Sequence, residues 1–195
     1  LMTDRSAIEL VEVAGRSLEE QLALLADISG GFAASLDIEE TLEVALERFM
    51  DYLEAEAASV FLLEEDADEL VCHKCAGPVN ITGLRIGAND GIVGKSMRSR
   101  ECQMVRDAAS HPDFADSVDA NTGFVTRSIL CAPLMVGAKP IGAIEVLNKR
   151  SADGLFDSGD QHLLMGLAAA AALGINNARM AEALVEKERI EKELE

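Results

Sequence analysis

Apolar residues recur at intervals of three and four in three long segments of the chain. This spacing places them along one side of a helix. We therefore expect helices over residues 17–32 and 37–53, and a long helix from Gly159 to the end of the chain. A looser version of the same pattern over residues 3–16 predicts a short additional helix.

Between these helices the apolar residues come in short runs separated by turn-forming residues, which is typical of β-strands. One run is almost continuously apolar, so we expect it to be a central strand that is buried on both faces. Tight turns between neighbouring runs favour antiparallel pairing. The predicted strands cover residues 57–63 (the central one), 70–76, 84–86, 102–105, 128–136 and 140–147. Together with a short helix over residues 89–100, they predict an α+β fold on a six-stranded antiparallel sheet.

Acidic side chains outnumber basic ones by 35 to 17, and the formal net charge is -18. Nucleic acids and anionic membranes attract basic patches, so we expect neither as a partner. An anionic small molecule remains compatible, because backbone amides at a helix start can hold a phosphate without a cation. No secretion signal is evident, and the longest apolar stretch, residues 163–175, is too short to cross a bilayer. These features predict a cytoplasmic protein.

Glu145 is a charged residue inside an otherwise apolar strand. Burying a carboxylate is unfavourable unless donors surround it. Glu145 is therefore a candidate acceptor for an N–H group of a ligand. Two other arrangements are open: Glu145 faces solvent at a sheet edge, or it pairs with Lys149 or Arg127.

Ile92 and Val93 follow Asp90 and Gly91 at a predicted helix start. Their amides, at the positive end of the helix dipole, form a candidate phosphate site. The alternative is an ordinary helix start capped by Asp90.

A polar loop before the fifth predicted strand carries Asp119, Thr122 and Thr126. These side chains either contact a ligand from a lid or satisfy backbone groups of the loop itself.

Lys149, Phe156 and Asp160 follow the last predicted strand. We expect Lys149 and Asp160 to form an ion pair between the strand end and the helix start, with Phe156 as an apolar plug. This clasp is expected to fasten the connecting loop and to close the lid.

Cys72 and Cys75 form a C-x-x-C arrangement. A zinc site usually takes four ligands from two such pairs, and the sequence has only one. Residues i and i+3 of a regular strand point to opposite faces, which separates the two sulfurs. We therefore expect neither a metal site nor a disulfide there. The order of Ser, Cys, His and Asp residues indicates no catalytic triad, and we expect no catalytic residues.

Two motifs resemble those of GAF domains, in particular the cyclic-nucleotide-binding GAF domains of phosphodiesterases and adenylyl cyclases. The first is D-x-x-T-G-F-x-T-R-S-I-L-C-x-P over residues 119–133. The second consists of Asn148-Lys149, Phe156 and Asp160, with Gln161 where that family usually has Glu. The order of predicted elements over residues 23–180 is also similar to that family.

The resemblance implies that the N- and C-terminal helices cover one face of the sheet and that a ligand pocket lies under short helices and loops on the other. It implies a regulatory module that binds cAMP or cGMP and dimerises through its terminal helices, with no other cofactor. Carried over by position, the pocket residues are Ser59, Cys75, Ala76, Ile92, Val93, Phe114, Asp119, Thr122, Thr126 and Glu145. Where this sequence has Cys75 and Ala76, phosphodiesterase-type domains have an aromatic residue and an Asp. The side chains that usually stack on the base and bond to its edge are therefore absent at these two positions.

The last residues of the chain are charged and helix-forming. Five of them follow a coiled-coil spacing: Met180, Ala183, Lys187, Ile190 and Leu194. We expect a helical extension over residues 1–22, a sensor domain over 23–180, and the start of a coiled-coil linker to an output domain over 181–195.

These observations favour a noncatalytic, dimeric sensor whose small-molecule ligand orders the loop over residues 107–126. A structural dimerisation module with a filled pocket is an alternative. A redox enzyme or sensor is a third possibility, since some GAF domains reduce free methionine sulfoxide through cysteines. This third possibility requires paired thiols.

Overall fold

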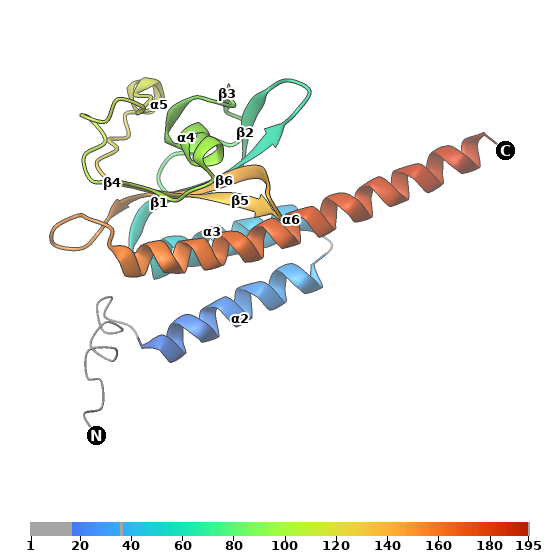
Figure 1. Cartoon of the computed structure of the whole chain (residues 1–195), viewed down its shortest axis with the longest axis horizontal. Coiled ribbons are helices and arrows are strands. Elements are labelled where there is room, and N and C mark those ends of the chain that lie inside the picture. The colour runs from blue at the N-terminus through green and yellow to red at the C-terminus, as the bar shows by residue number, and fades with distance from the viewer. Residues whose placement is uncertain (1–16, 36, 195) are drawn as a thin grey trace.

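A six-stranded antiparallel sheet with strand order β3-β2-β1-β6-β5-β4 forms the centre of the protein (Figure 1). The computed structural model describes residues 17–35 and 37–194, so the helix expected over residues 3–16 lies outside the described residues. The strands are β1 (Ala55–Glu64), β2 (Glu69–Ala76), β3 (Arg85–Gly87), β4 (Gln103–Val105), β5 (Ile129–Val136) and β6 (Lys139–Lys149). The predicted α+β class and six-stranded antiparallel sheet are confirmed.

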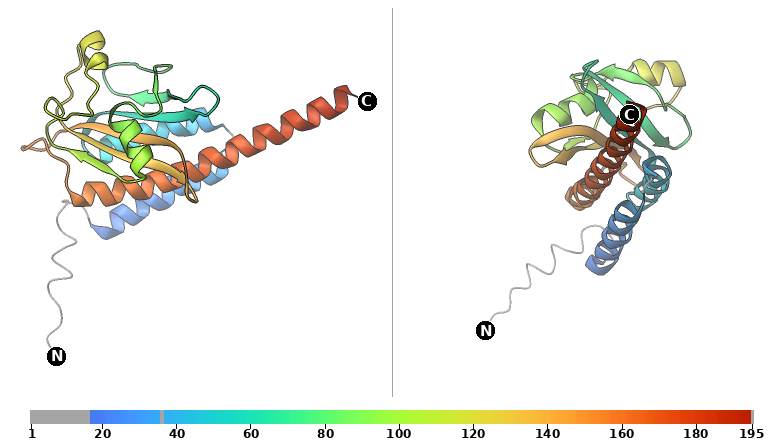
Figure 2. Two further views of the ribbon diagram at one scale, coloured as in Figure 1. Left: turned by 45° about the horizontal axis from the view of Figure 1, so that its top comes forward. Right: turned by 90° about the vertical axis from the view of Figure 1, so that its right-hand side faces the viewer.

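Three helices lie on one side of the sheet in two layers (Figures 1 and 2). Helices α3 (Ile38–Tyr52) and α6 (Ser158–Glu193) pack on the strands, and α2 (Leu18–Ala34) packs on α6. On the other side lie α4 (Gly91–Ser99) and α5 (Ser117–Thr122) with their loops. The terminal helices are therefore separated from the short helices by the sheet, as expected.

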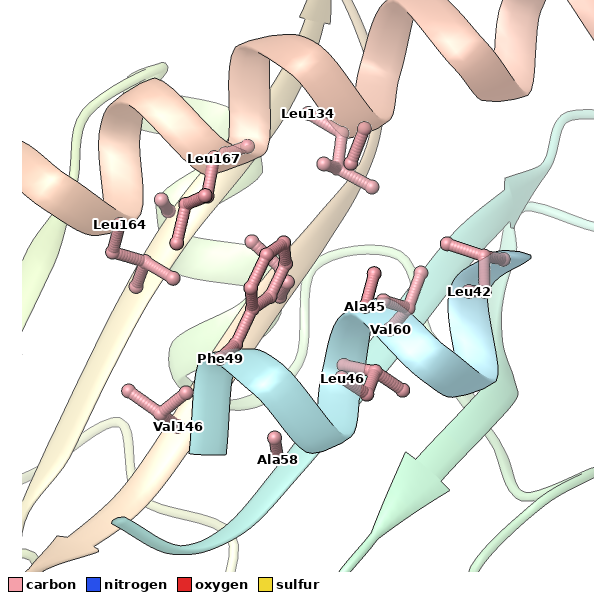
Figure 3. Close-up of a cluster of buried hydrophobic side chains, with 14 of the residues drawn as sticks. Leu42, Ala45, Leu46, Phe49, Ala58, Val60, Leu134, Val146, Leu164 and Leu167 are labelled. Atoms are coloured by element: carbon pink, nitrogen blue, oxygen red, sulfur yellow. The ribbon is translucent and has the colours of Figure 1, made fainter. Parts of the chain in front are cut away.

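The helix-covered face holds the larger apolar core. Phe49 of α3 projects toward α6, where Leu164 and Leu167 point back at it (Figure 3). Full burial of a Phe side chain stabilises a protein by about 1.5–3 kcal/mol. Gly174 of α6 allows α2 to pack closely against α6, because a Cβ added at Gly174 would lie 2.6 Å from the ring of Phe32 in α2.

The opposite face carries a second apolar cluster. Phe61 of β1 packs there with Ile92 and Val93 of α4. Its sequence neighbours, Val60 and Leu62, belong to the helix-side core, because successive strand residues alternate between faces. β1 is thus buried on both sides, as its continuously apolar sequence predicted.

Strand β2 contains a bulge at His73. Cys72 and Lys74 pair with consecutive residues of β1, which leaves His73 as an extra residue on β2. The extra residue shifts the alternation of side chains by one position. Cys72 and Cys75 therefore face the same side of the sheet and join the α4-side cluster. The prediction that their sulfurs point to opposite faces was wrong, because it assumed a regular strand.

Helix α6 continues well beyond the sheet (Figures 1 and 2). It is long and apolar enough to cross a membrane by length and composition, but half of its most apolar window is buried within the protein. A core helix passes the same test. The residues with coiled-coil spacing lie on the projecting part, where the chain is exposed from Arg179 onward. Their pairing with a second chain stays a prediction.

Candidate ligand-binding site

A cavity of about 120 Å³ lies between the sheet and the α4–α5 side of the protein. Strands β1, β2 and β6, the start of α4 and the α5 segment contribute to its walls. All ten residues that the sequence indicated as ligand contacts line this cavity. They are Ser59, Cys75, Ala76, Ile92, Val93, Phe114, Asp119, Thr122, Thr126 and Glu145.

Most of the lining is apolar, and the sequence reasoning missed one wall entirely. The segment between β2 and β3 contributes Val79, Ile81 and Leu84, and β3 contributes Ile86. The sequence pattern predicted strands only over residues 70–76 and 84–86 and gave the residues between them no role in the site. The available signal was the apolar residue at every second or third position of this segment.

One polar row crosses this side of the sheet. Cys75 of β2 lies opposite Ser59 of β1, Ser59 lies opposite Glu145 of β6, and Glu145 lies opposite Cys131 of β5. Directly opposite residues in antiparallel strands share a face, so the four side chains form one line. The sheet thus brings together three predicted contacts from distant parts of the sequence.

Glu145 accepts a hydrogen bond from Ser59 Oγ at 3.1 Å. Neither Lys149 nor Arg127 pairs with it, since both pair with other carboxylates. Burial raises the pKa of Glu145 to about 7, with the Ser59 hydrogen bond opposing the rise and Asp119 adding to it. The carboxyl lies deep in the protein, yet part of its surface is open to the cavity that it lines. The solvent-facing and ion-paired alternatives therefore do not describe Glu145.

Ile92 and Val93 lie in the first turn of α4. Asp90 occupies the N-cap position, but its side chain makes no hydrogen bond to the helix. The alternative prediction, in which the Asp90 side chain caps the amides of the first turn, is therefore wrong. Since both residues line the cavity, an anionic group placed there would meet the positive end of the helix.

The residues from α5 to Thr126 form a lid over the cavity. Asp119 accepts from the Thr126 backbone N–H at 2.6 Å and from the Thr126 hydroxyl at 2.8 Å. Thr122 donates to the Val118 carbonyl at 2.8 Å and accepts from the Phe124 N–H at 3.3 Å. These side chains line the cavity while satisfying groups of the lid itself. A ligand contact would have to use their remaining lone pairs or replace these bonds.

Asn148 fastens the end of the lid to the sheet, and the sequence reasoning missed this role. Its Oδ1 accepts from the N–H groups of Arg127 (2.7 Å) and Ser128 (3.3 Å). Its Nδ2 donates to the Val125 carbonyl and to a Glu56 carboxylate oxygen, both at 2.9 Å. Asn148 is buried and has a φ of 59°, which Asn adopts more readily than most residues. The signal was its place in the Asn148-Lys149 motif, to whose lysine alone the sequence analysis assigns a role.

Lys149 and Asp160 form the expected ion pair, with Nζ and Oδ1 2.8 Å apart. Lys149 Nζ also lies 5.9 Å from the centre of the Phe156 ring. However, none of these three residues lines the cavity, and Phe156 belongs to the helix-side core. This corrects the expectation that the clasp closes the lid: it fastens the connection between β6 and α6 on the opposite face.

The strand order, the helices on each face and the cavity under α4 and α5 are together characteristic of one family. The sequence model described as GAF domain matches residues 35–176, more than half of the chain. The chain belongs to the GAF domain family. The resemblance to GAF domains is thereby confirmed, and with it the general role of GAF domains as regulatory sensor modules in signalling proteins.

Several solved structures share this fold. The GAF domain of a phosphoenolpyruvate-protein phosphotransferase from Coxiella burnetii is 22% identical, with a TM-score of 0.76 over 85% of this chain and 98% of that chain. The free methionine-R-sulfoxide reductase from Neisseria meningitidis is 23% identical, with a TM-score of 0.69 over 83% of this chain and 91% of that chain. Because similar folds occur in a domain of a phosphotransferase and in a reductase, the fold does not assign a ligand.

A third relative is a probable 3',5'-cyclic phosphodiesterase, pde-5, of Caenorhabditis elegans. It is 28% identical to this GAF domain over 97 residues. The match covers 50% of this chain and 13% of that protein, so it concerns a small part of the phosphodiesterase.

Proposed function

We propose that this GAF domain is a regulatory sensor whose ligand occupies the cavity beside the polar row. Glu145 is the observation that carries the proposal. Its carboxyl lies deep in the protein, has one hydroxyl donor in Ser59, and faces a cavity. A buried carboxyl without a cationic partner is unfavourable for stability, and such groups concentrate at functional sites. An N–H group of a ligand would supply the missing donor.

A cyclic nucleotide is the ligand that we propose to test first. The edge of its base offers hydrogen-bonding groups for Glu145 and Ser59, and its phosphate suits the uncapped start of α4. The similarity to a probable cyclic phosphodiesterase supports this choice. No Lys, Arg or His side chain within residues 17–35 and 37–194 lines the cavity, so backbone amides would have to hold the phosphate.

The cavity must enlarge to admit a nucleotide. Its volume of about 120 Å³ is below the roughly 300–1,000 Å³ of pockets that bury drug-sized molecules. The lid is the part best suited to move, because α5 has only six residues and buries none of them. In this proposal the closed lid is the resting state, and the ligand shifts the population toward a reorganised lid.

Asn148 and Lys149 offer a path from the lid to α6. Asn148 bonds to Val125 and Arg127 at the end of the lid, and the next residue, Lys149, bonds to Asp160 in the first turn of α6. A lid displacement that moves this part of β6 would therefore act on the base of the long helix.

We further propose that two chains pair through their terminal helices. The projecting part of α6 would form one part of the interface, and α2 the other. Met180, Leu184, Val185 and Ile190 are exposed apolar residues on this part of the helix. A two-fold pairing would place both ends of α6 together, so that a change in helix angle reaches an output domain in the cytoplasm.

A dimerisation module without a ligand is the second candidate. Two observations favour it: the polar lid groups already satisfy one another, and Cys75 and Ala76 provide no aromatic surface for a base. This candidate predicts the same dimer but no response of its shape to a nucleotide.

Isothermal titration calorimetry with cAMP and cGMP tests the first candidate. We expect one of them to bind, and Glu145→Gln to weaken that binding by about tenfold, since the carboxylate acceptor is replaced by a neutral amide oxygen, which accepts a weaker hydrogen bond. Glu47→Gln on the exposed side of α3 is the matched control and should change nothing. Absence of heat with both nucleotides at millimolar concentration would reject the nucleotide, and a dimer that sediments identically with and without them would favour the second candidate.

A further inference from the structure

Cys72 and Cys75 are brought together by the bulge at His73. In a regular strand they would point to opposite faces, but the extra residue puts both on the α4 side of the sheet. Cys72 lies opposite Phe61 and Cys75 opposite Ser59, so the two cysteines occupy neighbouring positions on that face. None of the four cysteines of the chain takes part in a disulfide. The missing feature of the redox hypothesis, a pair of adjacent thiols, is therefore present.

Cys75 also organises the wall of the cavity that runs from Val79 to Leu84. Its sulfur accepts a hydrogen bond from the Ile81 backbone N–H at 3.3 Å. Its thiol donates to the Asn80 side-chain oxygen at 3.4 Å and shares a hydrogen bond with the Thr82 hydroxyl at 3.5 Å. Ile81 and Leu84 themselves line the cavity. Any change in the bonding of this sulfur therefore alters the segment that shapes the cavity.

We propose that Cys72 and Cys75 are a redox pair in the cavity wall, which a peroxide converts to a disulfide. Cys75 is partly exposed and lines the cavity, so its thiolate attacks the peroxide first and becomes a sulfenic acid, with release of water or an alcohol. The Cys72 sulfur then attacks the Cys75 sulfur, and the hydroxyl of the sulfenic acid leaves as water with the proton of the Cys72 thiol. Two thiols and one peroxide thus yield one disulfide, one water, and one water or alcohol.

The order of the two steps follows from the surroundings of the sulfurs. Cys72 is buried, and this burial, with smaller effects of Cys75 and Glu145, raises the pKa of the Cys72 thiol far above its ordinary value. A thiol that stays protonated is a poor first nucleophile. It is suited to the second step, in which the neighbouring sulfenic acid is already in place.

The disulfide would change the shape of the wall. Because of the bulge, Cys72 and Cys75 lie opposite Phe61 and Ser59, which are two residues apart in β1 and therefore separated by about 7 Å. A disulfide usually requires its two α-carbons to lie within about 7 Å and most often at about 5.5–6 Å, so this end of β2 must shorten at the bulge when the bond forms. Cys75 would leave its partners in the loop, so the Ile81 amide would lose its acceptor.

Peptide mapping of the whole chain after treatment with hydrogen peroxide tests the proposal. Trypsin places each cysteine on a separate peptide because Lys74 lies between the pair. Cys72 falls in residues 49–74, Cys75 in 75–85, Cys102 in 101–106 and Cys131 in 128–149. We expect a cross-linked product of peptides 49–74 and 75–85, and loss of two of the four free thiols. Hydrogen exchange of the Ile81 amide should become about tenfold faster, since one hydrogen bond is lost.

Cys72→Ser should abolish the cross-link and let Cys75 continue to sulfinic acid, whereas Cys102→Ser is the matched control and should leave the cross-link intact. Three results would overturn the proposal: all four thiols remain free, the wild-type Cys75 oxidises further while Cys72 stays reduced, or either sulfur joins the peptide of Cys102 or Cys131. The assay uses no nucleotide, so its outcome is independent of the proposed ligand.

Discussion

Lys149 Nζ lies 2.8 Å from Asp160 Oδ1, and the two side chains are only 10% and 6% exposed. Asp160 also accepts from the N–H of Asp157, the N-cap residue of α6, at 3.0 Å, so a single carboxylate in the first turn of α6 bonds to the end of β6 and to the N-cap. Burial raises the pKa of Asp160 above its usual value, and the hydrogen bond from Lys149 partly offsets the rise. The buried Asp160 carboxylate is therefore stabilised by the charge of Lys149.

Lys149→Met is expected to lower the free energy of unfolding by about 3–5 kcal/mol, because removing one partner leaves the other as an uncompensated buried charge. Urea denaturation followed by circular dichroism measures this change. Lys139→Met is the matched control, since Lys139 pairs with Glu65 on the surface and both are about 60% exposed. Its effect should be below about 1 kcal/mol, and equal effects of the two variants would contradict the account.

Asn148→Ala should destabilise the protein by about 3 kcal/mol or more. It removes bonds to four groups and places a residue with a Cβ at a φ of 59°. Asn148→Gly loses the same bonds but tolerates the conformation, so it should be about 1 kcal/mol more stable than the Ala variant. Hydrogen exchange should also show faster exchange at Arg127 and Ser128 in both variants. Normal protection of these amides would show that Asn148 does not fasten the lid.

Glu145→Gln should be more stable than the wild type above neutral pH. A pKa raised from 4.5 to about 7 means that the folded protein holds the proton more tightly than the unfolded chain. The stability contributed by this group is full below about pH 4.5 and is lost as the pH rises through about 7. Above about pH 7, ionised Glu145 lowers the free energy of unfolding by about 3 kcal/mol relative to its protonated form. Unfolding of both proteins at several pH values should thus give a difference that grows from about pH 5 to 8; a constant difference would mean that Glu145 does not titrate there.

Gly174→Ala should weaken the packing of α2 on α6 by about 1–3 kcal/mol, because the added Cβ would lie 2.6 Å from the Phe32 ring. Gly30→Ala in α2 meets no atom within 4 Å and should instead stabilise the helix by about 0.5–1 kcal/mol. Thermal unfolding distinguishes the two signs. Destabilisation by both substitutions would show that α2 does not pack as described.

The sequence was informative about the fold because hydrophobic periodicity and turn residues act locally. The apolar stripe of α3 and the continuous run of β1 each determine an element and the faces it buries. The motif over residues 119–133 then located the lid and its Asp119. These features could be predicted because each depends on residues close together in the chain.

Three features could not be predicted, because each depends on residues that are far apart in the chain. The bulge at His73 follows from how β2 pairs with β1, and no local signal placed both Cys72 and Cys75 on one face. The polar row likewise requires the pairing of four strands. Asn148 was missed since its partners lie 20 or more residues away in the chain.

The central claim is that a small molecule binds against Glu145 and the start of α4. Two-dimensional NMR of the labelled 20.8 kDa chain during a titration with cAMP or cGMP measures this directly. The account predicts that the Ile92 and Val93 amides and the Glu145 side-chain carboxyl carbon shift together and saturate at one nucleotide per chain. Unchanged signals at these three positions in millimolar nucleotide, or shifts confined to the surface of α6, would contradict it.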